Sequence, residues 1–128
     1  MGKRALWKDM GILVDNTRII KHPASEELLG DVPEAIKTAD LILYYYVTGY
    51  YEGSGALLCR MNKEWFIHSL SHCSCYGPLA ELYDSIYTQL RSDADKRPKT
   101  LTDAKIKWFA NVIYNKELFE YAESIGVR

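Results

Sequence analysis

Strand-like apolar patterns dominate the middle of the chain. Residues 41–47 (LILYYYV) are aliphatic, aromatic and β-branched and contain no glycine or proline, which is typical of a strand. Two further apolar runs cover residues 56–61 and 65–70, and the Asn62-Lys63 pair between them is a turn signal. Together these segments predict a three-stranded antiparallel meander.

Helical spacing appears on both sides of this sheet. After the sheet, apolar residues recur every three to four positions over residues 78–91 and 102–126, with a polar linker at 92–100 between them. Before the sheet, residues that cap helices or favour the first turn predict short helices over 25–30 and 33–38.

The order of elements predicts an α+β fold in which a small antiparallel sheet carries helices packed on one face. We expect a single domain spanning residues 1–128. It would consist of an N-terminal segment with short helices (1–39), the sheet (40–71), and a turn followed by two helices (72–128). Within residues 12–20, two short apolar runs around a turn signal form either a small hairpin or irregular segments.

Composition and charge narrow the functional classes. The net charge is −1, and there is no clear basic face of the kind that nucleic-acid binders carry. The chain is also not acidic enough to imitate DNA. Ten tyrosines suit a surface that contacts proteins, because each has an apolar ring and a polar tip. No signal peptide or membrane-length apolar run is seen and the cysteine count, three, is odd, so we expect a cytosolic protein with reduced thiols.

The segment HCSCYGP, residues 72–78, is the strongest candidate for chemistry. It lies between the last predicted strand and a helix N-terminus, whose partial positive charge favours thiolate over thiol. Three interpretations remain open. The segment is a zinc site, a nucleophilic cysteine with His72 or His68 as base, or a turn that launches the helix.

The predicted turn fixes which residues of the hairpin face each other. With Asn62-Lys63 as the turn, Cys59 lies opposite Phe66 and Leu57 lies opposite His68. The end of the third strand then lies beside the start of the second. The segment GYYEGSG lacks a phosphate-binding pattern, and we interpret it as a wide hairpin loop. We therefore expect this loop to meet HCSCYGP at one edge of the sheet.

This geometry favours one set of zinc ligands: His72, Cys73, Cys75 and Glu52. Thiolate and imidazole are the ligands that zinc prefers, and Glu52 is the acidic residue nearest the motif. The alternatives for the fourth ligand are His68, Cys59 and Asp40, of which Asp40 requires a different strand pairing.

The motifs as a group resemble a family of small bacteriophage and prophage proteins. The similarity lies in the pattern Y-x-x-G-x-Y-E-G-S-G at residues 46–55, W-x-x-x-x-L at 65–70 and HCSCYGP at 72–78, about a third of the chain. The resemblance implies a phage setting and the cytoplasm of a bacterial host. Zinc-containing anti-CRISPR proteins that bind Cas9 are one similar class.

Two functional hypotheses follow. The favoured one is a non-enzymatic zinc-binding protein that blocks a bacterial host protein, such as a CRISPR effector nuclease, by docking on it without contacting nucleic acid. The alternative is a small metal-dependent hydrolase with Glu52 as general base. A metal-free phage interaction domain is a third possibility, and the sequence does not identify the oligomeric state.

Overall fold

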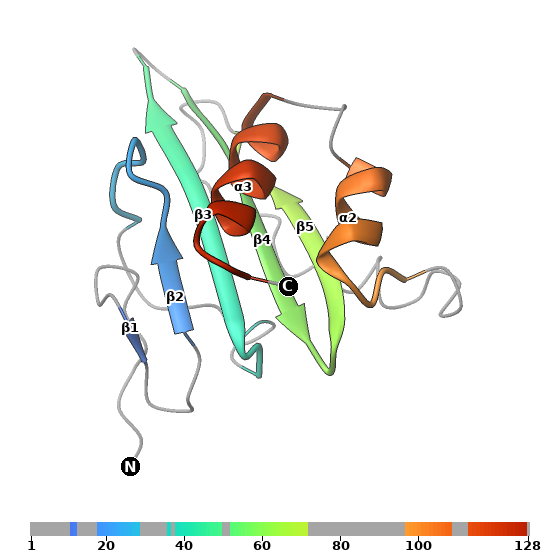
Figure 1. The fold of residues 1–128 in the computed structure, drawn as a ribbon. Coiled ribbons are helices and arrows are strands. Elements are labelled where there is room, and N and C mark those ends of the chain that lie inside the picture. The colour runs from blue at the N-terminus through green and yellow to red at the C-terminus, as the bar shows by residue number, and fades with distance from the viewer. Residues whose placement is uncertain are drawn as a thin grey trace.

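The computed structural model describes residues 11–12, 18–28, 36, 38–49, 52–71, 97–108 and 113–127 (Figure 1). These residues form a five-stranded sheet with the strand order β1-β2-β3-β4-β5, together with two helices. The predicted α+β class is therefore confirmed. The strands are β1 (Gly11–Ile12), β2 (Arg18–Lys21), β3 (Leu41–Thr48), β4 (Gly53–Met61) and β5 (Glu64–Ser69), and the helices are α2 (Leu101–Trp108) and α3 (Ile113–Ser124).

The central part of the sheet is formed by consecutive strands. β4 pairs antiparallel with both β3 and β5. The turn between β4 and β5 contains Asn62 and Lys63, whose φ angles are 51° and 64°. Two successive positive φ angles match the right-handed twist of the flanking strands and produce a tight two-residue turn.

The sheet is larger than the sequence predicted, and it is mixed rather than antiparallel. β2 pairs in parallel with β3, and β1 pairs antiparallel with β2, in agreement with the hairpin alternative for this segment. A parallel neighbour requires a long crossover, and the chain between Lys21 and Leu41 supplies it. Such a non-local pairing leaves no turn signal in the sequence.

Residues 22–28 do not form the helix that was predicted to begin at Ser25. The Ser25 hydroxyl oxygen accepts the N–H of Tyr46 at 2.8 Å, and the N–H of Glu26 donates to the Tyr46 carbonyl oxygen at 2.7 Å. This segment therefore covers the edge of β3 beyond the end of β2. Of the second predicted helix, Ile36 lies in a turn closed by a 3.1 Å bond from the Ala39 N–H, and most of the rest is outside the described residues.

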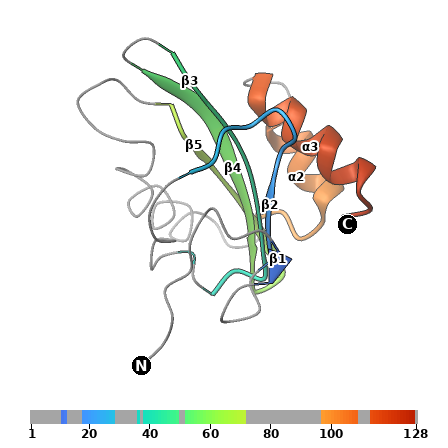
Figure 2. The same cartoon turned by 90° about the vertical axis from the view of Figure 1, so that its left-hand side faces the viewer.

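Both helices pack on one face of the sheet, α3 over β3 and β4 and α2 against β5 (Figure 2). The segment predicted as one helix over residues 102–126 is thus two helices. Neither is long and apolar enough to cross a bilayer, and the rest of the described chain contains no such helix. The helix predicted over 78–91 falls outside the described residues.

The sheet is buried on both faces. The core under α2 and α3 includes Leu43, Leu58, Trp65 and Phe119, and the core of the opposite face includes Ile42, Leu57, Cys59, Phe66 and Leu70. Strands buried on both sides lack a polar face, which is why residues 41–46 contain a nearly continuous apolar run.

Candidate metal centre

The β3–β4 hairpin positions Glu52. Thr48 pairs with Gly53, and the Gly49 N–H donates to the Glu52 carbonyl oxygen at 2.8 Å, so the two strands stay hydrogen-bonded as far as Gly49 and Glu52. The prediction of a wide loop was therefore wrong. The side chain of Glu52 is exposed beside the tip of this tight hairpin.

Gly55 allows the two strands of the hairpin to approach each other. A Cβ atom at this position would overlap the carbonyl oxygen of Tyr45 and lie 2.9 Å from the Cα of Tyr46. Both obstacles are backbone atoms, so no side chain can rotate to make room. Gly55 is thus required by close packing of β3 on β4.

The same end of β3 is braced by the segment that covers its edge. The carboxylate of Glu26 accepts the hydroxyl of Thr48 at 2.8 Å and also accepts the Thr48 N–H. These two hydrogen bonds favour the charged carboxylate and lower the pKa of Glu26. The strand that leads into the Glu52 hairpin is therefore fixed at its last residue.

The chain leaving β5 lies beside this hairpin. Ala56 pairs with Ser69, and the Leu70 N–H donates to the Gly55 carbonyl oxygen at 2.9 Å. Ser71, which directly precedes the HCSCYGP segment, donates its N–H to the Ser69 hydroxyl at 3.2 Å. The predicted meeting of the hairpin and the start of that segment at one sheet edge is borne out as far as Ser71.

The register that led to this prediction is also correct. Cys59 pairs with Phe66 and Leu57 pairs with His68, as the Asn62-Lys63 turn indicated. The proposed ligands His72, Cys73 and Cys75 lie outside the described residues, so the zinc site itself stays a prediction. Within the described residues, no group of three or more His, Cys, Asp or Glu side chains could hold a metal ion.

Two of the alternative fourth ligands are badly placed. Cys59 is fully buried, and burial together with the charge of Asp40 raises the pKa of its thiol to about 12. It also lies four residues along β4 from Gly55, a separation of about 13 Å. Asp40 donates its N–H to the Arg60 carbonyl oxygen and accepts the Arg60 Nε–H at 2.9 Å, which places it at the opposite end of the sheet.

His68 is the better-placed alternative. It is 6% exposed and pairs with Leu57. Because side chains alternate along a strand, it shares a face with Phe66 and Leu70, and both of these belong to the core opposite the helices. Glu52 from the hairpin and His68 from β5 are therefore the two candidates for the fourth ligand that lie at the end of the sheet where the predicted motif begins.

His22, which directly follows β2, makes several side-chain contacts. Its ring stacks on Tyr45 at 4.2 Å between centroids and meets Tyr121 edge-on at 5.2 Å. Its Nδ1 accepts the Ala24 N–H at 3.1 Å, and its Nε2 lies 3.8 Å from a carboxylate oxygen of Glu117. The imidazole therefore links the segment after β2 to α3.

The chemistry of His22 is that of a packed neutral side chain. Burial is the main cause that lowers its pKa, and Lys21 adds to it, while Glu117 acts in the opposite direction. Because Nδ1 accepts a hydrogen bond, the proton of the neutral ring sits on Nε2, facing Glu117. Neither nitrogen is then available as a general base.

The structure is that of a small α+β protein with a mixed sheet. The β3–β4 hairpin that carries Glu52 lies beside the chain that follows β5. A scan against protein-family models, a search of curated proteins and a search of solved structures each gave no match. The resemblance to phage proteins rests on the quoted motifs alone.

Proposed function

We propose that this chain is a phage-encoded, non-enzymatic zinc-binding protein that inhibits a bacterial defence effector by binding to it in the host cytoplasm. A Cas9-type nuclease is the favoured target, on the strength of the motif resemblance. The observation that carries the zinc part is the hydrogen bond from Leu70 to Gly55, since it brings the chain entering HCSCYGP beside the Glu52 hairpin.

The donor set fits zinc. Cys73 and Cys75 offer thiolates, His72 an imidazole and Glu52 an exposed carboxylate, and a structural zinc site takes four such ligands. Bound there, zinc would join the hairpin to the segment that leaves β5. The result would be one rigid edge, and rigid surfaces bind partners with a smaller loss of conformational entropy.

A non-enzymatic role agrees with the chemistry of the described side chains. Among the nucleophiles and bases that the structure describes, Cys59 is a buried neutral thiol, the Nδ1 of His22 accepts a backbone N–H, and His68 is only 6% exposed. A hydrolase would need an open coordination position for water. Four protein ligands would fill the tetrahedral shell and leave none.

Replacing Glu52 with alanine separates the two roles. The non-enzymatic proposal predicts loss of zinc or of thermal stability in Glu52→Ala, whereas a hydrolase would keep its fold and lose turnover. Glu120→Ala is a matched control, because this carboxylate is also exposed but lies on α3 and is not among the predicted zinc ligands. The zinc content of both variants should be measured by mass spectrometry, and their stability by thermal unfolding.

The partner is tested by mixing the zinc-loaded protein with purified Cas9 and guide RNA and measuring co-elution and DNA cleavage. The proposal predicts a complex and reduced cleavage. Absence of both would refute the favoured target, and a screen of other purified defence nucleases would then test the wider class.

A further inference from the structure

A groove runs across the end of the sheet that is opposite to the Glu52 hairpin. It consists of three adjoining depressions with volumes of about 640, 620 and 370 Å³. Lys99 lines the first and second, Asp40 and Arg60 line the second and third, and Val127 lines the third and first. We call these three depressions the basic groove.

The charge of the basic groove differs from that of the whole chain. Its described lining contains five cations and two carboxylates, whereas the chain has a net charge of −1. The five cations are Arg18, Arg60, Lys63, Lys99 and Lys105. Among the described residues, the lining of the basic groove therefore carries more cations than carboxylates.

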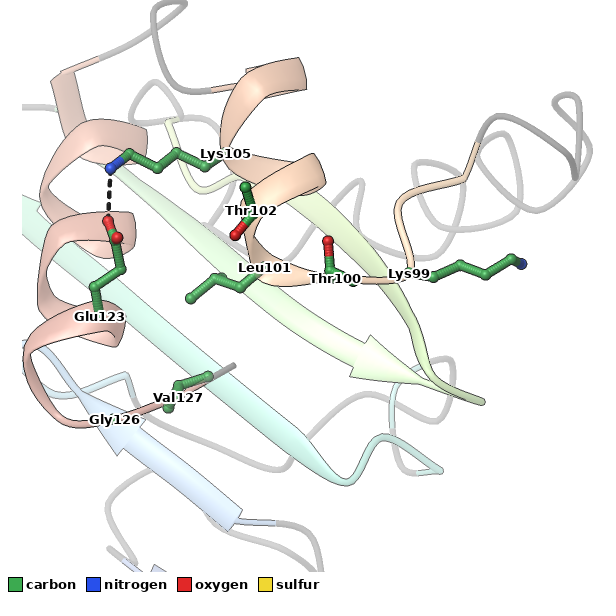
Figure 3. Close-up of a pocket in the computed structure, with 8 residues that line it drawn as sticks. All are labelled: Lys99, Thr100, Leu101, Thr102, Lys105, Glu123, Gly126 and Val127. Atoms are coloured by element: carbon green, nitrogen blue, oxygen red, sulfur yellow. Dashed lines mark hydrogen bonds and ion pairs between the residues drawn. The ribbon is translucent and has the colours of Figure 1, made fainter.

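Both carboxylates are already paired with cations of the groove. Asp40 pairs with Arg60, and Glu123 accepts a 2.6 Å bond from Lys105, which bridges α2 and α3 in Figure 3. Lys99 points away from this bridge in Figure 3 and lies 3.3 Å from Glu64. Glu64 is shared with Arg97 at 3.1 Å, so its single charge faces two cations.

The register of the sheet determines the distance between two of these cations, Arg18 and Arg60. Arg18, Leu41, Arg60 and Trp65 form one row across β2 to β5, and residues directly opposite one another point to the same face. The guanidinium of Arg60 lies 5.4 Å from the centroid of the Trp65 ring. Arg18 and Arg60 therefore stand on the helix-bearing face, two strands or about 10 Å apart.

We infer that the basic groove is a docking surface for an acidic segment of a partner protein. Net positive charge provides electrostatic complementarity, and the exposed Ile125 offers an apolar contact beside the charges. Protein is favoured over nucleic acid because the described lining contains no aromatic side chain on which bases could stack.

The test uses the full-length protein and a fluorescein-labelled peptide of glutamate and leucine, followed by fluorescence anisotropy. Arg18→Glu should weaken binding by about tenfold, the effect expected for reversing one charge near an anionic ligand. Lys116→Glu makes the same change in charge on an exposed part of α3 outside the groove, and it should leave affinity unchanged within about twofold. Lys63→Glu serves as a second groove variant if Arg18→Glu unfolds.

Equal losses in the groove and control variants would overturn the inference, as would no peptide binding at low salt. Tighter binding of a single-stranded oligonucleotide than of the peptide would overturn it in favour of nucleic acid. The inference does not depend on zinc, because the groove and the Glu52 hairpin lie at opposite ends of the sheet. Peptide affinity should therefore persist in a Cys73→Ala/Cys75→Ala variant even where zinc is lost.

Discussion

Replacing Gly55 with alanine should destabilise the protein and disrupt the edge that bears Glu52. The new methyl group would overlap the Tyr45 carbonyl oxygen and lie 2.9 Å from the Tyr46 Cα. Overpacking a rigid site costs about 1–3 kcal/mol. Since the obstructing atoms are strand backbone rather than side chain, we expect the upper end, about 3 kcal/mol.

Urea unfolding followed by tryptophan fluorescence measures this effect. With a slope of about 1.5 kcal/mol per molar urea, a loss of 3 kcal/mol lowers the midpoint by about 2 M. Gly49→Ala is the matched control, since its Cβ would meet the Glu52 carbonyl oxygen at an ordinary 3.9 Å and the free energy of unfolding should change by less than about 0.5 kcal/mol. If Gly55→Ala were as stable as Gly49→Ala, the close approach of β3 and β4 could not be the reason for the glycine.

Three further predictions concern other parts of the molecule. Burial places the pKa of His22 below its unfolded value of 6.5, so its contribution to stability is complete above that pH and decreases as the pH falls below it. His22→Gln should therefore show a shallower loss of stability than wild type between about pH 7 and pH 5 in thermal unfolding, and parallel curves would contradict this assignment. In a Cys73→Ala/Cys75→Ala variant, Cys59 should not react with a thiol reagent until denaturant is added, because burial raises the pKa of its thiol to about 12. Fast reaction of Cys59 in the folded protein would contradict its buried position. Lys63→Gly should raise the free energy of unfolding by about 0.5 kcal/mol in urea titrations, since glycine adopts the positive φ of 64° without the cost that lysine incurs, and a loss of stability would argue against that turn conformation.

The local parts of the sheet could be predicted from sequence because their signals are local. The run at residues 41–47 has strand composition, and the Asn62-Lys63 turn fixes the register that pairs Leu57 with His68. From that register alone, Glu52 and the start of HCSCYGP could be assigned to one edge. The parallel pairing of β2 with β3 has no such signal, since it joins segments separated by a long crossover.

The helix wrongly predicted at Ser25 shows that the same acceptor side chains can cap a helix or bind the edge of a strand. A serine followed by glutamates is an N-terminal helix signal because their oxygens accept free backbone N–H groups. Here the donated N–H groups belong to Tyr46 and Thr48, in the part of β3 that lies beyond the end of β2. The sequence identified acceptor side chains, but tertiary context decided which donors they would meet.

The basic groove was beyond sequence reasoning for a similar reason. Arg18, Arg60 and Lys99 are far apart in the chain, and the short basic cluster at residues 96–99 follows Asp93 and Asp95, so the sequence shows no clear basic face. Strand pairing brings Arg18 and Arg60 into one row, and the hydrogen bond from the Trp65 N–H to the Pro98 carbonyl oxygen places Lys99 at the same end of the sheet. The net charge therefore indicated a nearly neutral protein, whereas the fold brings cations from distant segments together in the basic groove.

The zinc content of purified, untagged protein tests the central proposal most directly. Elemental analysis should be made on wild type and on the Cys73→Ala/Cys75→Ala variant. The proposal predicts one zinc ion per wild-type chain and none in the variant. Wild-type protein without stoichiometric metal, or a variant that retains it, would contradict the zinc site at HCSCYGP.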